Sequence, residues 1–439
     1  MAEPQERSKI TPLSAWDQSS SRFHIRLVLN FELDDSKRKE VAAHLGSVLK
    51  RLSAERPDLA GRLHVNGEFD GERHGERPGW IYLRESPDFD IPLEIVNVED
   101  KVRSFQDLKA DSFPAKDFID PLFGYTGPSL FCGLGVPAAV VRRTRANGVT
   151  SERQPSFHQL LKKCPEYVEL SKPMGPNQPT LRPGGESEST YVKDGKIFVL
   201  RKEKIRKLKE LVMHHAPAER LPSSYICLST LFWVFAANSR MRSEEDQPSW
   251  ESHGRATMTN PVNWRFRAFQ EENKGYYGNS AALAQMVTSV QEVSLAAHDW
   301  QAYARLVRAS EDAIRNVNEK FVRRRTRLFE AAPNPRFLGL YMDPRIPQDL
   351  AFNTWRDFGA DTLWDLCGTG SNGSGIGGGI VKPDSLRRSQ DSWNMGGTLI
   401  LPARGDSDLY EVLLTIPKPA MDQLKSTERF MRWIDRVLD

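Results

Sequence analysis

Residues 225–240 read YICLSTLFWVFAANSR and are apolar almost throughout. Such a run predicts a helix that is buried on all sides, because a surface helix keeps one polar face. The run before it, residues 200–215, reads LRKEKIRKLKELVMHH and places Ile205, Leu208 and Val212 at helical spacing. Together the two runs predict a pair of helices that opens a second structural unit with a large core.

Strand patterns lie on both sides of this helix pair. Residues 23–31, FHIRLVLNF, alternate between apolar and other side chains, as a strand with one buried face does. Further strands are predicted over residues 79–85, near Val199 and over residues 407–417. Helical patterns cover residues 36–53, with Ser36 as the predicted cap, residues 298–329 and residues 420–438. Strands and helices mix without strict alternation, which indicates a mixed α/β fold.

Composition narrows the class of protein. The chain has 439 residues, of which 39% are hydrophobic, and a net charge of +3. This balance of charge argues against a nucleic-acid binder. The cysteines are far apart and form no C-x-x-C pair, so neither a disulfide framework nor a metal site is expected; they are Cys132, Cys164, Cys227 and Cys367. No run is apolar over the length of a membrane span, and a cytoplasmic location is expected.

A change of composition marks the expected domain boundary. From Ser171 to Lys196 the chain is rich in Pro, Gly and Ser and poor in apolar residues. Such a stretch is typical of a linker or a long crossover loop. We therefore expect two domains, residues 1–185 and residues 186–439.

Two charged or glycine-rich motifs have simple structural explanations. The glycine run from Gly368 to Ile380 contains G-x-G-x-x-G, but Pro383 excludes the helix that a dinucleotide-binding loop must open, so a flexible loop is favoured. The basic run from Arg323 to Arg325 lies beside Glu319 on a predicted helix, and a solvated helix face is the favoured interpretation.

The paired histidines of VMHHAPAER suggest a catalytic base at first sight. His215 and Glu219 have the spacing H-x-x-x-E. However, Pro217 ends the helix, so Glu219 is not on the same helical face as His215. His214 and His215 then lie in a last helical turn, where the helix dipole favours a cation. The structural interpretation is favoured over the catalytic one.

Several stretches resemble the BAHD acyltransferases, and within them the fungal branch of trichothecene 3-O-acetyltransferases. They keep the order of that family over nearly the whole chain. They read LSAWDQ, LKRLSAERPDLAGRL, SYICLSTLFWVFA, NPVNWRFRAFQEENKGYYGN, TWRDFGADTLWDLCGTG and GGTLILPAR…YEVLLTIPKPAMDQL.

This resemblance implies a mixed α/β fold of two chloramphenicol-acetyltransferase-like domains, each a mixed sheet flanked by helices, with a channel between them. It implies acyl-CoA as co-substrate, acetyl-CoA in this branch, and a small-molecule acceptor with a hydroxyl group. No bound cofactor and no metal are expected. The expected protein is a cytoplasmic monomer of fungal secondary metabolism that contacts neither nucleic acid nor membrane.

The chain departs from the family at the catalytic motif. The family's H-x-x-x-D histidine precedes the linker, but the corresponding stretch, PAAVVRRTRANGVTSERQ, contains no histidine. His158 is the nearest candidate, and the spacing of Phe157, Leu160 and Leu161 explains it equally well as part of a helix. The sequence therefore leaves three interpretations open: an active acyltransferase, an inactive binding or scaffold protein of the same fold, and a truncated gene model of an active enzyme.

Other residues map onto the family's remaining motifs. By resemblance, Arg265 and Asp365 are expected to form a structural ion pair. Tyr277, Gly278 and Asn279 match the GY-x-G-N segment, and Gly368 matches the D-F-G-W-G loop, so all four are expected in the channel or its loops.

Overall fold

The computed structural model describes most of the chain. It covers residues 9–19, 27–65, 78–98, 101–118, 136–137, 156–171, 192–243, 254–269, 279–343, 346–368, 380–388 and 397–439. Three stretches discussed above lie outside these residues. They are the stretch without the expected catalytic histidine (residues 138–155), the middle of the predicted linker and the glycine run after Gly368. The two domain ranges stay a prediction.

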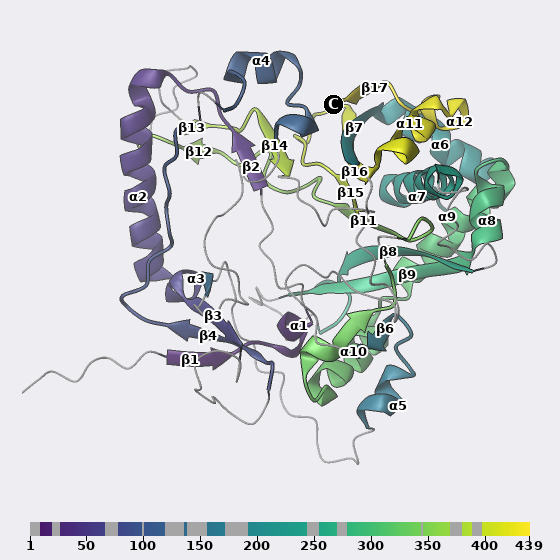
Figure 1. Cartoon of the computed structure of the whole chain (residues 1–439), viewed down its shortest axis with the longest axis horizontal. Coiled ribbons are helices and arrows are strands. Elements are labelled where there is room, and N and C mark those ends of the chain that lie inside the picture. Colours follow the sequence, from purple (N-terminus) through teal and green to yellow (C-terminus); the bar gives the residue numbers. More distant parts are fainter. Residues whose placement is uncertain are drawn as a thin grey trace, which may run out of the picture.

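A seven-stranded mixed sheet organises the second half of the chain (Figure 1). Its strand β11 (Leu350–Thr354) runs parallel to both of its neighbours, β15 (Gly397–Ile400) and β8 (Arg255–Asn263). The other strands pair antiparallel; they are β16 (Leu409–Pro417), β7 (Lys193–Arg201), β17 (Arg436–Leu438) and β9 (Ala281–Ser289). The sheet is mixed, as the sequence predicted.

One face of this sheet carries the main core. Helix α7 (Ser224–Ser243) packs there, and Leu228, Phe232 and Trp233 on it are fully buried. Around it lie helices α6 (Lys202–His215), α8 (Val290–Ala296), α9 (Trp300–Arg315), α11 (Lys418–Ser426) and α12 (Glu428–Met431). The predicted all-round burial of residues 225–240 is confirmed, because a helix between a sheet and other helices has no solvent face.

The first half of the chain forms a smaller antiparallel sheet. Its strands are β1 (Lys9–Pro12), β4 (Ile81–Glu85), β3 (Arg62–Val65) and β5 (Val136–Pro137). Helix α2 (Arg38–Glu55) rises beside it and leads into α3 (Pro57–Ala60) (Figure 1). The predicted strand over residues 79–85 and the predicted helix over residues 36–53 are both confirmed.

Several segments join the two halves. Strand β2 (Leu27–Asn30) pairs with β14 (Ser385–Arg388), and β6 (Tyr167–Glu169) pairs with β10 (Leu338–Leu340). The 3-10 helix η2 (Ala115–Asp117) covers the second face of the seven-stranded sheet, where Ala115 packs with Ile197 and Val199. Segments that are far apart in sequence therefore share cores.

A buried arginine fixes one of these junctions. Arg387 on β14 donates from Nε to the carbonyl of Phe113 at 2.8 Å and from Nη2 to the carbonyl of Ser112 at 2.9 Å. It also donates to the Glu411 carboxylate at 3.0 Å. Ser112 and Phe113 have φ angles of 59° and 53°, a conformation that costs energy for residues with a Cβ. The arginine satisfies the carbonyls of this strained corner after α4 (Phe105–Ala110).

The structure corrects several local predictions. Ser36 is not the cap of α2, because it lies inside the 3-10 turn η1 (Asp35–Lys37), whose cap is Asp34. The pattern over residues 298–329 forms two helices, since Asn318 caps α10 (Glu319–Ala331). The closing segment likewise breaks at Thr427, and its end forms the edge strand β17.

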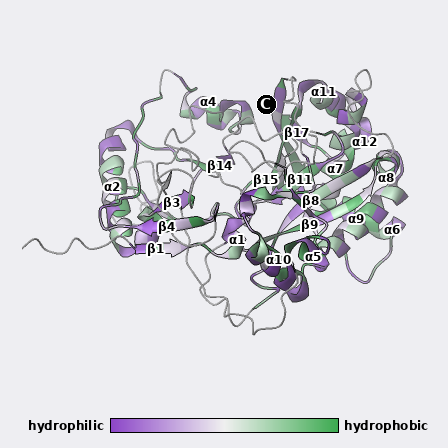
Figure 2. Cartoon of the chain, turned by 60° about the horizontal axis from the view of Figure 1, so that its bottom comes forward, coloured by the Kyte–Doolittle hydropathy of each residue, from purple (hydrophilic) through white to green (hydrophobic). Residues whose placement is uncertain are grey.

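The predicted solvated face of α10 is only partly correct. Arg323 is half exposed and pairs with Glu319 at 2.6 Å, as predicted. Arg325 is buried instead, and its Nε and Nη2 donate to the two carboxylate oxygens of Glu166 at 2.5 and 2.8 Å. The ribbon of α10 carries both hydrophilic and hydrophobic residues (Figure 2). The segment formed by helix α5 (Phe157–Leu161) and strand β6, here called the outer hairpin, packs against α10. This packing buries the Arg325 side chain.

Candidate functional site

The first helix of the chain is bonded to the start of β9. In α1 (Ala15–Gln18), Ser14 and Asp17 form a capping box. The Asp17 carboxylate also accepts the backbone N–H of Asn279 at 2.8 Å, and the Asn279 side chain donates to the carbonyl of Trp16 at 2.9 Å. Asn279 is thus placed at a junction between the two halves. Tyr277 and Gly278 lie outside the described residues.

Asp17 is a structural residue that spacing alone did not single out. Burial raises the pKa of its carboxyl, while hydrogen bonds from Ser14 and Asn279 and the nearby charge of Arg265 act to lower it. A buried carboxylate with these donors holds two chain segments together. The S-x-x-D pattern of LSAWDQ signals the capping box, but not the second bond to a residue more than two hundred and sixty positions away.

Arg265 lies just after a long strand, and Asp365 lies in a short one. Arg265 follows β8, and its backbone N–H donates to the side chain of Asn263 at 3.1 Å. Asp365 ends the short strand β12 (Trp364–Asp365), which pairs with β13 (Ile380–Val381). Both residues interact with neighbours, and their pairing with each other stays a prediction.

Gly368 lies against helix α2. Its φ is +70°, and a Cβ at this position would overlap the ring of His44. Only glycine fits this backbone conformation and this close approach without strain. The glycine run is therefore packed against α2, in the first half of the chain, at its first residue, Gly368.

The histidine candidates lie on the outside of the described structure. His158 is on α5, at the lower edge of the molecule in Figure 1, and its side chain is 72% exposed. Its Nε2 lies 3.2 Å from the Glu169 carboxylate on β6. This contact lies on the exposed surface of the α5–β6 segment, and a catalytic role for His158 stays a hypothesis.

His214 and His215 lie where the helix pattern placed them. They form the last turn of α6, which ends at His215, and their rings meet edge to face at 4.9 Å. The prediction of a helix end is confirmed.

Among the described residues, no group of three His, Cys, Asp or Glu side chains is arranged to hold a metal ion. None of the described helices is long and apolar enough to cross a membrane.

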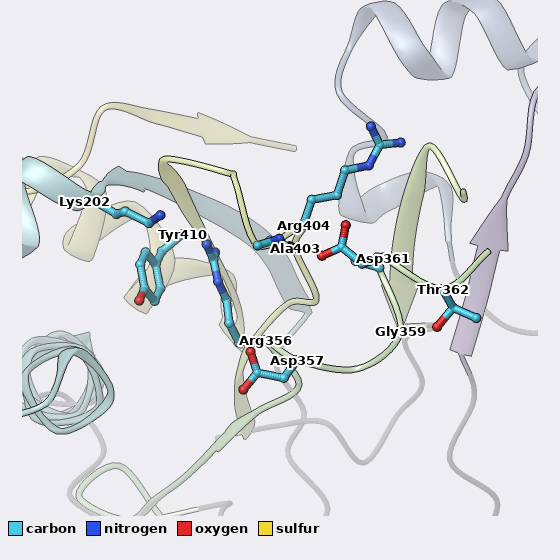
Figure 3. Close-up of a pocket in the computed structure, with 11 residues that line it drawn as sticks. Lys202, Arg356, Asp357, Gly359, Asp361, Thr362, Ala403, Arg404 and Tyr410 are labelled. Atoms are coloured by element: carbon cyan, nitrogen blue, oxygen red, sulfur yellow. Dashed lines mark hydrogen bonds between the residues drawn. The ribbon is translucent and has the colours of Figure 1, made fainter. Parts of the chain in front are cut away.

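A pocket of about 600 Å³ opens at the carboxyl edge of the seven-stranded sheet (Figure 3). Four segments build it: the start of α6, the loop after β11, the turn between β15 and β16, and β16 itself. The charged side chains in its lining are Lys202, Arg356, Asp357, Asp361 and Arg404, and Tyr410 adds an aromatic ring. Sequence patterns did not reveal this pocket, because its residues come from four separate segments.

Comparison with known proteins identifies the fold. No protein-family model and no curated protein matches the sequence. F. graminearum TRI101, a trichothecene 3-O-acetyltransferase crystallised with ethyl coenzyme A, matches 98% of this chain and 99% of its own length at a TM-score of 0.68 and 15% identity. The chain has the fold of these acyltransferases.

Two further solved structures have the same fold as this chain. The F. sporotrichioides TRI101 complex with coenzyme A and T-2 covers 97% of this chain and 99% of its own, at a TM-score of 0.65 and 16% identity. Vinorine synthase covers 99% and 96%, at a TM-score of 0.50 and 15% identity. The predicted resemblance to BAHD acyltransferases is confirmed at the level of the fold.

Proposed function

We propose that the chain is an acyl-CoA-dependent O-acyltransferase that acts on a hydroxyl group of a small natural product. The observation that carries this proposal is the fold match over almost the whole of both chains. The similar TRI101 structures hold coenzyme A together with T-2 mycotoxin or deoxynivalenol. Acetyl-CoA as donor, a fungal secondary metabolite as acceptor, a monomeric state and a cytoplasmic location belong to the same proposal.

In this reaction the acceptor oxygen attacks the thioester carbon of acyl-CoA. The acceptor O–H gives up its proton, the ester forms, and CoA leaves as the thiol. The protein must align the hydroxyl with the thioester, and alignment alone lowers the entropic part of the barrier. A general base raises the rate further, typically by about 10²–10⁴.

A second function is favoured by one specific observation. The stretch that should carry the catalytic histidine contains none. The same fold without a base would bind acyl-CoA or a small molecule and would not turn them over. A truncated gene model of an active enzyme would give the same sequence, and sequencing the transcript across residues 135–156 distinguishes it.

Turnover separates the two functions. Purified protein is mixed with acetyl-CoA and a panel of alcohols, and the release of free thiol is followed. An acyltransferase releases thiol only when an acceptor is present, and mass spectrometry shows the ester. A binding protein takes up coenzyme A in calorimetry but releases no thiol above the buffer rate.

A further inference from the structure

One end of the pocket at the sheet edge holds a guanidinium that is fixed in position. Arg356 donates to the carbonyls of Leu409 and Ser407, and its guanidinium carbon lies 4.1 Å from the centre of the Tyr410 ring. An arginine has five N–H donors, so donors remain after these two bonds. A guanidinium held in this way loses little entropy when it binds a further acceptor.

The carboxylates of the described residues do not neutralise this end of the pocket. Within the described residues Arg356 makes no ion pair, whereas Arg404 donates to the carbonyl of Pro383 and its charge acts on Asp361. Lys202 is 3.8 Å from the exposed Asp408 carboxylate, a weak surface pair. Figure 3 shows Lys202, Arg356 and Tyr410 together on one side of the pocket. A positive side therefore faces the cavity.

The acidic side chains of the lining differ in their roles. Asp361 is occupied, since it accepts Lys382 Nζ at 2.7 Å and the N–H of Gly405 at 2.8 Å. Asp357 makes no side-chain hydrogen bond or ion pair within the described residues, although it lines the same cavity. A free carboxylate repels an anion but accepts hydrogen bonds from hydroxyl groups. A ligand that suits both sides carries an anionic group and hydroxyl groups.

We propose that this pocket binds a hydroxyl-bearing anion, with a phosphate or carboxylate group toward Lys202 and Arg356 and hydroxyl groups toward Asp357. The volume of about 600 Å³ is within the usual range of small-molecule sites. Two sources supply this chemistry: the nucleotide end of an acyl-CoA donor, and an acidic, hydroxylated acceptor. The choice between them rests on the proposed function, whereas the anion site does not.

Calorimetry with defined probes tests the site. The probes are adenosine 3′,5′-bisphosphate, inorganic phosphate and uncharged adenosine, each titrated into the wild-type protein at low salt. The two charged probes are expected to bind, more weakly as salt screens the cations, and adenosine is expected not to bind. Lys202→Gln and Arg356→Gln should each weaken bisphosphate binding roughly 5- to 10-fold.

Two further variants sharpen the result. Lys207→Gln is the matched control, because Lys207 lies on the same helix but pairs with Glu203 outside the pocket. It should change affinity by less than about twofold, as expected of an exposed pair. Asp357→Asn removes the repulsion and should tighten phosphate binding roughly 2- to 5-fold. The anion site is overturned if neither charged probe binds at about 10 mM at low salt, where screening of the cations is weakest, or if both pocket variants bind like the control.

Competition identifies the source of the anion. If coenzyme A displaces the bisphosphate, and both pocket variants weaken coenzyme A, the donor occupies the pocket. If the bisphosphate binds no tighter than phosphate and coenzyme A does not displace it, the pocket takes an acidic acceptor. Failure of the anion site leaves the proposed function intact, since that function is judged by turnover of the wild-type protein alone.

Discussion

The ion pair of Glu166 and Arg325 gives a prediction whose size follows from its burial. The two side chains are 5% and 6% exposed, and two hydrogen bonds of 2.5 and 2.8 Å join them. The guanidinium also lies over the Phe321 ring, 3.4 Å from its centre. Glu166→Gln leaves that charge buried with a neutral acceptor. Breaking one partner of a buried pair costs about 3–5 kcal/mol, and we expect a loss near the lower end because the amide oxygen keeps one bond.

Urea denaturation followed by tryptophan fluorescence measures this loss. Glu319→Gln on the same helix is the control, because Glu319 and its partner Arg323 are each 50% exposed; a surface pair contributes about 0–1 kcal/mol. The double variant Glu166→Leu with Arg325→Met removes both charges and should recover most of the loss. The reasoning is refuted if Glu166→Gln costs no more than the control, or if the double variant is as unstable as the single one.

Three more predictions concern stability. Gly368→Ala should lower the free energy of unfolding by about 1–3 kcal/mol, since it combines a positive φ with overlap on His44; a urea midpoint equal to that of wild type would contradict this. The raised pKa of Asp17 means that the folded state holds its proton more tightly than the unfolded chain, so wild type should lose stability relative to Asp17→Asn as the pH rises from 3.8 through the raised pKa; parallel pH profiles would argue against it. Burial, with Arg242 and Arg429, lowers the pKa of His298, so the unfolded chain binds the proton more tightly and stability should fall as the pH drops below 6.5. Thermal melts of His298→Gln should show a flatter profile in that range.

The sequence predicted the elements whose signal is local. The burial of residues 225–240 follows from continuous apolar content, and the end of α6 at His215 follows from Pro217. Contacts between segments that are distant in sequence leave no local signal in the pattern of residues. The burial of Arg325 depends on a hairpin that is distant in sequence, so the charge run alone indicated a solvated face. The break at Thr427 arises because the chain turns to add β17 to the sheet edge, which overrides a continuous helical pattern.

The site was less predictable than the fold for the same reason. The family resemblance placed Asn279 and Gly368 at loops, and the structure shows their partners to be Asp17 and His44 from the first half of the chain. Such partners depend on how the two halves pack. The pocket at the sheet edge likewise needs the carboxyl ends of several strands to meet, which only the sheet order determines.

The last prediction concerns the missing base. We expect the chain to transfer acyl groups slowly or not at all, and His158→Ala to leave any turnover unchanged. His158 is 72% exposed and paired with Glu169 on an outer hairpin, whereas a general base must come within hydrogen-bond reach of the acceptor hydroxyl. The matched control is His214→Ala with His215→Ala, because both rings belong to a helix end. Turnover at an ordinary enzyme rate, on the order of 1–10³ per second, would overturn the first part. A loss of a hundredfold or more in His158→Ala, with the control unchanged, would make His158 the base; the outer hairpin would then belong to the active site.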